Sequence, residues 1–464
     1  MMLSHFHIRS RFVRSAAAAA CSMHLVGCTI YQEKPLDYGT SLPTSLSGVV
    51  IDKEVMPLPE LRSHVFDPSD GLDMTEVAML AVVNNPALRL ARDDAGVARA
   101  QAFAAGLLPD PQISLSRDFP FNGATASTAY SLGLSYAINT LLTYSTNKAA
   151  ARADLDKADL NVLWQEWQTV AKARTLFVRL TKEDAVMHVL LENRALVNDR
   201  YDRTRRALNE GLLTLDAVSP HLTALQDVQR QINDLERLMS QTRHDLNALL
   251  GLSAEVSLPL VGDSELPKID ESRLLALLPL LLRNRPDIRA LEAGYAAQDA
   301  HYRAAILSQF PALTIGVTRS RDTSDVNSRG FNVSVNLPIF NRGRGEIAIA
   351  IATRQRLYDE YIQRLTTSRS EVQGILDEQH INLEQLREVN EGLAALEEAA
   401  AKARSAFTAR NIDALAFAGV ETSLLAKRVE KLNLEQSILE QQVALRAVVG
   451  SALPETPNPE GSAR

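Results

Sequence analysis

The stretch GFNVSVNLPIFNRGRGEI, residues 330–347, decides the fold predicted for this chain. Its first half alternates apolar side chains with small polar ones, the period of two that marks a β-strand with one apolar face. Pro338 ends this strand because proline lacks the backbone N–H that a strand interior requires. Asn341, Gly343 and Gly345 then loosen the backbone, and helix-compatible sequence follows. We therefore expect a strand that leads directly into a long helix, with these four residues as the junction.

A strand of this kind suits either a half-exposed sheet or the wall of a water-filled barrel in a membrane. The same alternation predicts further strands at about residues 112–118, 128–138 and 312–319, in addition to the one at about 330–338. No apolar run approaches the ~18 residues of a membrane-spanning helix. If this chain crosses a membrane, it must therefore use strands.

The chain contains the same order of elements twice. Helix-breaking prolines recur at matching positions, Pro86 with Pro286 and Pro109 with Pro311. Each copy reads as a helix pair, two strands, a long helix and a return helix, and such internal repetition is a strong indicator of architecture. We expect a first repeat at 71–252 with a helical hairpin at 145–250, a linker at 253–273, a second repeat at 274–451 with a hairpin at 345–449, and a flexible tail at 452–464.

The long helices carry heptad repeats. Apolar residues step by three and four along 225–249, 386–407 and 425–443, with one polar member in the first series, Thr242, and one in the third, Gln436. A sustained period of 3.5 predicts left-handed supercoiling against a neighbouring helix. Residues 146–209 contain no proline or glycine, so the first long helix could approach ~95 Å at 1.5 Å per residue.

The amino terminus reads as an export signal over residues 1–27. Arg9, Arg11 and Arg14 precede an alanine-rich segment, as in secretory leaders. The tetrapeptide that ends at Cys28, LVGC, resembles the lipobox of bacterial lipoproteins, which implies an acylated Cys28 at the start of the mature chain. The alternative is an ordinary leader that ends near a cysteine. The proline-rich residues 28–70 suit an extended, lipid-anchored arm.

Composition excludes several classes of function. The formal charge is −7 and no basic patch is present, which argues against nucleic acid as a partner. Removal of the leader takes Cys21 with it, so the mature chain has no cysteine pair for a disulfide or a metal. His221 and His244 lie far apart with no third ligand, so we expect no metal site and no cofactor. No Ser/His/Asp set occurs in a catalytic frame, and we expect no enzyme activity.

The two repeats, the strand-to-helix junction, the LLPDPQIS entry to the first strand (107–114) and the lipobox together resemble the TolC family of bacterial outer-membrane efflux proteins. The resemblance covers residues 71–450. It implies a mainly α-helical fold with a membrane β-barrel. Three identical chains would each give four strands to a twelve-stranded barrel and their helices to a coiled-coil tunnel through the periplasm. Closing the sheet across three chains would remove the edges that lipid cannot satisfy.

The resemblance also implies a function. The homotrimer would be the passive exit duct of a tripartite efflux system in the outer membrane of a Gram-negative bacterium. It would work with a periplasmic adaptor and an inner-membrane pump of the resistance-nodulation-division type, and carry heavy-metal cations or drugs. Two alternatives remain open: a type I secretion duct for proteins, and a non-conducting envelope scaffold lipoprotein. The strands favour a duct, because a scaffold has no use for four strands with Ser/Asn faces.

In this family the tips of the return hairpins close the duct and open when the adaptor docks. The resemblance assigns gate and adaptor contacts to the residues at both tips: Glu210, Gly211, Thr214, Asp216, Arg410, Asn411 and Asp413. Arg410 stands where the family usually has glycine. Ala416 and Gly419 stand where the best-known members place aperture aspartates, which leaves Asp413 as the nearest acid. Arg410 either bridges to a carboxylate of a neighbouring hairpin, such as Glu210 or Asp216, or is solvated at an exposed tip.

Overall fold

The computed structural model describes residues 31–36, 39, 42–46, 51–52, 54, 56–121, 127–262, 266–267 and 269–450. The predicted leader, the acylation site Cys28 and the tail at 452–464 lie outside these residues. The chain divides into two units, Met1–Leu42 and Pro43–Arg464. In the first unit, residues 31–36 have no regular secondary structure. Everything below concerns the second unit.

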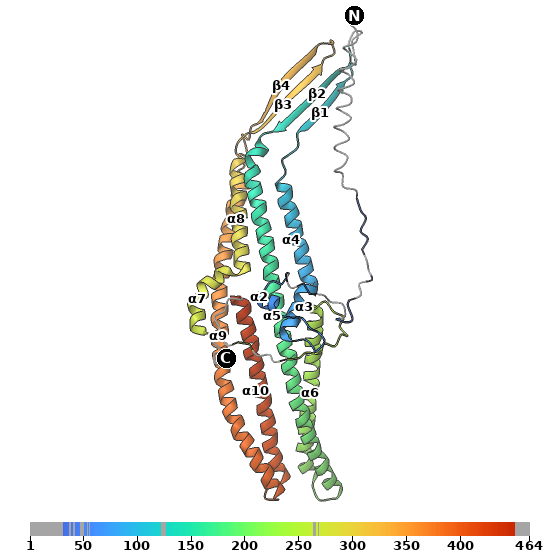
Figure 1. Ribbon diagram of the computed structural model, residues 1–464, viewed down its shortest axis with the longest axis vertical. Coiled ribbons are helices and arrows are strands. Elements are labelled where there is room, and N and C mark those ends of the chain that lie inside the picture. The colour runs from blue at the N-terminus through green and yellow to red at the C-terminus, as the bar shows by residue number, and fades with distance from the viewer. Residues whose placement is uncertain are drawn as a thin grey trace. The chain divides into compact units, whose positions relative to one another are not determined.

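The elements of the second unit follow the same order twice (Figure 1). After a short helix α2 (Pro59–Ser63), the first copy comprises α3 (Met74–Asn84), α4 (Pro86–Ala105), β1 (Gln112–Asp118), β2 (Ala129–Ala137), α5 (Asn139–Asn209) and α6 (Leu215–Leu249). The second comprises α7 (Glu271–Asn284), α8 (Pro286–Leu307), β3 (Ala312–Arg321), β4 (Asn327–Asn336), α9 (Arg344–Thr408) and α10 (Ala414–Val449). None of the described helices has a stretch apolar enough to span a membrane.

The first helix pair of each copy is fixed by local sequence. The side chain of Asp73 accepts hydrogen bonds from the backbone N–H groups of Thr75 and Glu76, and Glu76 reaches back to the N–H of Asp73. This capping box satisfies the free donors at the start of α3. Pro86 and Pro286 are the first residues of α4 and α8, where a missing N–H costs nothing. The predicted helix breaks therefore lie where the prolines place them.

The four strands form one antiparallel sheet in the order β1-β2-β3-β4. Paired residues of antiparallel strands point to the same face, so the register sorts the side chains into two sets. One row joins Ile113, Leu134, Val317 and Phe331 on a single face. The next residues along each strand, such as Ser114 opposite Gly133, lie on the other face. The alternation seen in the sequence thus produces one apolar and one small, polar face.

Glycine on the polar face allows the neighbouring side chains to close over the sheet. A Cβ atom at Gly316 would lie 2.3 Å from Oδ1 of Asn332 and 3.0 Å from the carbonyl oxygen of Leu134. A Cβ atom at Gly133 would lie 2.5 Å from Oγ of Ser114. A side chain at either glycine would therefore require Asn332 or Ser114 to move. The polar face is therefore the crowded side of the sheet, as expected if the sheet curves toward that face.

Below the sheet, the long helices pack through their heptad positions. Val228 and Ile232 of α6 form a buried cluster with Val186, Leu190 and Val197 of α5. Residues of α10 pack against the same cluster, so the helices of the two repeats share one core. The helix α5 begins before the predicted residue 145 and contains 71 residues, which corresponds to about 107 Å. One continuous helix therefore runs from the sheet to the first hairpin tip (Figure 1).

Two segments predicted to be irregular contribute to the core. Within the arm expected at 28–70, Met56 and Leu61 are fully buried against α3 and α5. In the linker expected at 253–273, the backbone N–H of Leu72 donates to the carbonyl oxygen of Pro259 (2.8 Å), and Val261 donates back to Leu72 (3.0 Å). The proline-rich sequence concealed this burial, because its apolar residues show no helix or strand period.

A buried ion cluster fixes the break between α7 and α8. The guanidinium of Arg285 donates to both carboxylate oxygens of Asp287, at 2.9 and 2.8 Å. Arg364 of α9 donates to the same carboxylate at 2.7 Å. Both guanidinium groups lie over the ring of Trp164 on α5, at 4.8 and 5.8 Å from its centre. The side chain of Arg285 is wholly inaccessible to solvent, so its positive charge has to be compensated by the carboxylate of Asp287.

Replacing Asp287 should therefore destabilise the protein strongly. Burial raises the pKa of this carboxyl, but the hydrogen bonds and charges of Arg285 and Arg364 outweigh burial and hold the pKa below its ordinary value. The stabilisation is present above the unfolded-state pKa of about 3.9 and is lost as pH falls through the lower folded-state value. Asp287→Asn should cost about 3–5 kcal/mol of unfolding free energy at pH 7.

Denaturant unfolding of the two variants Asp287→Asn and Asp299→Asn provides the measurement. Asp299 lies on the same helix and pairs with Arg303 and Arg354 in a more exposed setting, where such pairs contribute only about 0–1 kcal/mol. Equal losses in the two variants would show that the buried cluster has no special role.

Candidate functional site

The strand-to-helix junction contains one position at which the backbone conformation favours glycine. Arg342 and Gly343 both have a positive φ, of 50° and 65°. A Cβ atom at Gly343 would also lie 2.7 Å from Oγ of Ser308, so both the conformation and the close contact favour glycine here. Gly345 lies inside the first turn of α9 with open space around it. The prediction that Gly345 loosens the backbone is thus not supported, since a helical conformation suits any residue.

The first predicted tip, between α5 and α6, closes with a glycine turn. Gly211 has a φ of 74°, and its N–H donates to the carbonyl oxygen of Leu208 (2.9 Å). This is the left-handed residue that commonly ends a helix. Glu210 and Asp216 are exposed. Thr214 precedes α6 but its side chain makes no capping hydrogen bond.

The second tip, between α9 and α10, has the same turn without the glycine. Arg410 has a φ of 62°, and its N–H donates to the carbonyl oxygen of Phe407 (2.9 Å). Asn411 donates to the carbonyl oxygen of Ala406 (2.8 Å). A non-glycine residue in this conformation costs about 1–2 kcal/mol. Among the described residues of the single chain, no ion pair includes Arg410.

Asp413 has a structural role at this tip. Its side chain caps α10 by accepting a hydrogen bond from the backbone N–H of Ala416 (2.7 Å). Capping by aspartate is worth about 0.5–2 kcal/mol. The acid nearest the expected aperture positions therefore also serves as the cap of α10.

Contacts just above the second tip hold its two helices together. Arg404 of α9 donates to Glu421 of α10 at 2.8 Å, and this hydrogen bond raises the pKa of the Arg404 guanidinium. The rings of Phe407 and Phe417 stack with their centres 5.0 Å apart. The tips are therefore the ends of firmly paired helices, and not loose loops.

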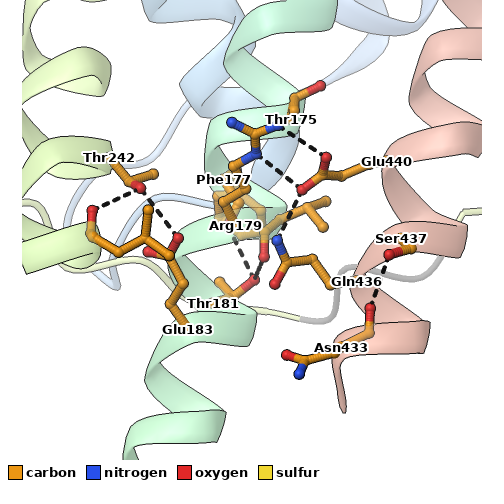
Figure 2. A network of polar contacts seen from close by, with 12 residues as sticks. Thr175, Phe177, Arg179, Thr181, Glu183, Thr242, Asn433, Gln436, Ser437 and Glu440 are labelled. Atoms are coloured by element: carbon orange, nitrogen blue, oxygen red, sulfur yellow. Dashed lines mark hydrogen bonds and ion pairs between the residues drawn. The ribbon is translucent and has the colours of Figure 1, made fainter. Parts of the chain in front are cut away.

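A polar network joins the two repeats halfway along the helices. Figure 2 shows Arg179 of α5 directed at Glu440 of α10, and Glu183 directed at Thr242 of α6. The guanidinium of Arg179 binds both carboxylate oxygens of Glu440, at 2.9 and 3.0 Å. Lys182 binds Glu435 at 2.8 Å. Charged pairs thus connect α5 to α10 at this level, in addition to the apolar packing between the helices.

Glu183 is the one buried carboxylate of this network. Oγ of Thr242 lies 3.1 Å from Oε1 of Glu183 and 3.0 Å from the carbonyl oxygen of Leu238. One hydroxyl hydrogen serves only one of these acceptors at a time. Oε2 of Glu183 has no partner among the described residues. A protonated Glu183 would donate to Thr242, which would then donate to Leu238, so the geometry favours the neutral acid.

Only one feature of the sequence pointed to this contact. Thr242 was the polar member of an otherwise apolar heptad series, and such a residue needs a buried hydrogen-bond partner. Nothing in the local sequence indicated that Glu183, on a long helix with many charged residues, would be buried. Pairing between two distant helices is not encoded in the local pattern.

His64, Asp73 and Glu76 also come together, with potential ligand atoms within 4.8 Å of one another. No metal site was expected from the sequence. Glu76 accepts backbone hydrogen bonds from Asp67 (2.6 Å) and Asp73 (3.0 Å), and Asp73 caps α3. Capping of α3 accounts for the positions of Asp73 and Glu76, and His64 lies 3.1 Å from the carboxylate of Asp73.

Glu183→Gln should stabilise the protein at neutral pH. Burial raises the pKa of Glu183, and the hydrogen bond from Thr242 and the charge of Arg179 only partly offset this. Stability should therefore fall as pH rises from the unfolded-state pKa of about 4.3 through the raised folded-state pKa. The amide would remove a buried, unsatisfied charge, worth about 1–3 kcal/mol. Melting temperatures across pH 4–8 should show a gain for Glu183→Gln that grows with pH.

Glu440→Gln is the control, because its partner Arg179 lies in a half-exposed pair. It should lower the melting temperature slightly at neutral pH. A Glu183→Gln variant that melts below the wild type at pH 8 would contradict the argument.

The two tips provide a matched pair of substitutions. Arg410→Gly should relieve the left-handed strain and stabilise the second tip by about 1–2 kcal/mol, and Gly211→Arg should destabilise the first by a similar amount. Amide hydrogen exchange of the tip peptides measures such local opening. Arg410→Gly should slow exchange and Gly211→Arg should accelerate it, each by about 5- to 30-fold. Faster exchange in Arg410→Gly would instead show that the arginine makes a bridge in the assembled protein.

Comparisons with known proteins agree with this architecture. Residues 277–451 match the family model of the outer membrane efflux protein. The chain is 28% identical over 185 residues to the probable efflux pump outer membrane protein TtgC of Pseudomonas putida. It is 27% identical over 224 residues to the cation efflux system protein CusC of Escherichia coli. The matched regions span 38% of this chain and 37% of TtgC, and 46% of this chain and 48% of CusC.

Solved structures extend the likeness over most of the chain. CusC superposes with a TM-score of 0.67 and 21% identity, covering 86% of this chain and 98% of CusC. The outer-membrane channel OprN superposes with a TM-score of 0.70 and 17% identity, covering 91% and 99%. At these identities the superpositions establish the fold, and the sequence matches establish the relationship. The second repeat therefore matches the outer membrane efflux protein model, and the chain as a whole has the fold of outer-membrane channels such as CusC and OprN.

Proposed function

We propose that this protein is the outer-membrane exit duct of an efflux system, assembled from three copies of the chain. The observation that carries the proposal is the sheet. It has one apolar face, one small polar face and two unpaired edges, and it is continuous with long paired helices. Each of these features has a use in a membrane channel, and together they have none in a water-soluble scaffold.

The edges of the sheet support assembly. All residues of β1 and β4 are exposed, whereas β2 and β3 are partly covered. In lipid, unpaired backbone N–H and C=O groups cost several kcal/mol each. Pairing β4 of one copy with β1 of the next would satisfy both edges. Four strands are too few for a barrel with a useful bore, and three copies would supply twelve.

The two faces support the same arrangement. Ile113 and Phe331 are 75% and 69% exposed in the single chain, and lipid would cover them. The glycine-rich polar face, toward which the neighbouring side chains crowd, would line the water-filled interior. Barrels in membranes alternate apolar and polar residues in this way.

The paired helices would form a tunnel in the periplasm, ending at the tips formed by residues 210–216 and 410–413. We propose that these tips close the duct and that a periplasmic adaptor, coupled to an inner-membrane pump, opens it. The firm pairing of α9 and α10 above the second tip supports movement of a hairpin as one body. Acylation of Cys28 would add a second anchor in the outer membrane.

We propose small toxic compounds, either metal cations or drugs, as the cargo. The names of the relatives support this choice, since TtgC is named as an efflux pump protein and CusC as a cation efflux protein. Protein secretion is the alternative within the duct class, and an envelope scaffold is the alternative outside it. We retain the interpretation that the chain transports and does not catalyse.

Thiol labelling of two adjacent residues of β4 tests the proposal. Ser334 lies on the polar face opposite Thr314, and Val335 lies on the apolar face opposite Leu313. In vesicles, a membrane-impermeant thiol reagent should modify Ser334→Cys at least tenfold faster than Val335→Cys, in a background without other free thiols. Native mass spectrometry should show three chains, and the trimer should conduct ions in planar bilayers.

Equal labelling of both cysteines would contradict a membrane barrel. A trimer that labels as expected but never conducts, even with its tips loosened by Gly211→Arg, would favour the scaffold. Cells that lack the protein should become sensitive to toxic small compounds. Loss of a secreted protein with unchanged sensitivity would favour protein secretion.

A further inference from the structure

The apolar face of the sheet changes character at the end away from the helices. There, beside the β1–β2 and β3–β4 connections (Figure 1), the apolar rows give way to arginine. Leu115, Leu132, Arg319 and Arg329 form one row across the four strands. The outermost row contains Arg117 and Arg321, with Tyr130 between them. Four arginines thus end the face that the proposed function assigns to lipid.

Arg319 and Arg329 lie directly opposite each other on β3 and β4. Like charges in this position repel and destabilise a strand pair. Both side chains are exposed, and no ion pair includes either of them among the described residues. Without a ligand, this repulsion has no compensating ion pair in the part of the chain that the structure describes.

The nearby acidic side chains either have other partners or lie on the opposite face of the sheet. Asp325 pairs with Arg321. The carboxylate of Asp322 accepts hydrogen bonds from the backbone N–H groups of Ser324 and Val326, both at 2.9 Å. Asp118 pairs in register with Ala129 and lies on the polar face. The connection at 119–128 contains no acidic residue. Among the described residues, the excess positive charge on the apolar face is therefore not neutralised.

An apolar groove of about 610 Å³ begins beside the opposed arginines. Its walls include Arg319 and Arg329 at one end and continue along the apolar face: Ile113, Leu132, Leu134, Val317 and Phe331. An anionic group at the arginines would thus lie next to a surface suited to hydrocarbon chains. One ligand with both properties is an acylated lipid with a phosphate headgroup.

We infer that Arg319 and Arg329 bind the phosphate of an acylated glycolipid of the lipid A type in the outer leaflet, with its acyl chains along the groove. This inference rests on the proposed function, which places the sheet in the outer membrane with its hairpin ends facing outward. Guanidinium groups bind phosphate through paired hydrogen bonds, and arginine clusters at membrane surfaces recognise lipid headgroups. The phosphate would convert a repulsive arginine pair into a bridge.

Native mass spectrometry of the full-length assembly in neutral detergent, titrated with bisphosphorylated lipid A, tests the inference. Arg319→Gln/Arg329→Gln should weaken retention of lipid A at least tenfold. Arg319→Lys/Arg329→Lys, which keeps the charge but not the paired hydrogen bonds, should weaken it less. The matched control is Arg369→Gln/Arg387→Gln on α9, which removes the same charge at two exposed positions and should stay within twofold of the wild type. Dephosphorylated lipid A should bind the wild type as weakly as lipid A binds the glutamine variant.

Unchanged retention in the glutamine variant would overturn the inference, and so would tight binding of inorganic phosphate alone, which would assign the arginines to a free anion. Cell fractionation and the Ser334→Cys labelling separate this outcome from failure of the proposed function. A protein outside the outer membrane would overturn both. A protein that fractionates and labels as expected, but retains lipid A equally in all variants, would overturn only the lipid site.

Discussion

The hydrogen-bonding capacity of the two edge strands constrains the rest of this structure. β1 and β4 are each paired on one side only, and their apolar face needs a nonaqueous neighbour. A barrel shared between copies resolves both needs, because it leaves no edge and gives the apolar face to lipid. The long helices then have to leave the sheet in the same direction. The junction at Gly343 performs this change of direction within a few residues.

Much of this architecture could be predicted from the sequence, because strands and paired helices produce short-period patterns of apolar residues. The alternation around Phe331 marked a strand, the heptads marked paired helices, and the recurring prolines marked the duplication. These signals are local and depend on backbone geometry alone. For the same reason, a glycine that the backbone conformation favours, such as Gly343, could be predicted from the sequence.

The candidate site was harder to predict from the sequence, because its contacts join residues far apart in the chain. Asp413 was predicted as the acid nearest the aperture, and only the structure shows that its carboxylate also caps α10. Arg410 could be recognised as an unusual residue, yet only the structure shows that it adopts the left-handed conformation. The pairing of Glu183 with Thr242, and the opposition of Arg319 and Arg329, depend on the register between elements. No local pattern specifies such a register.

The pairing of β2 with β3 has a consequence for how the molecule is made. Each two-stranded hairpin joins strands that are close in the chain, whereas Tyr136 of β2 meets Ile315 of β3 across nearly a whole repeat. Contacts of such long range form slowly, because closing the long intervening loop costs chain entropy before any favourable contact has formed. The four-stranded sheet therefore completes only after most of the chain has been synthesised. Until then its apolar rows are exposed to water, and the protein depends on whatever shields them during that delay.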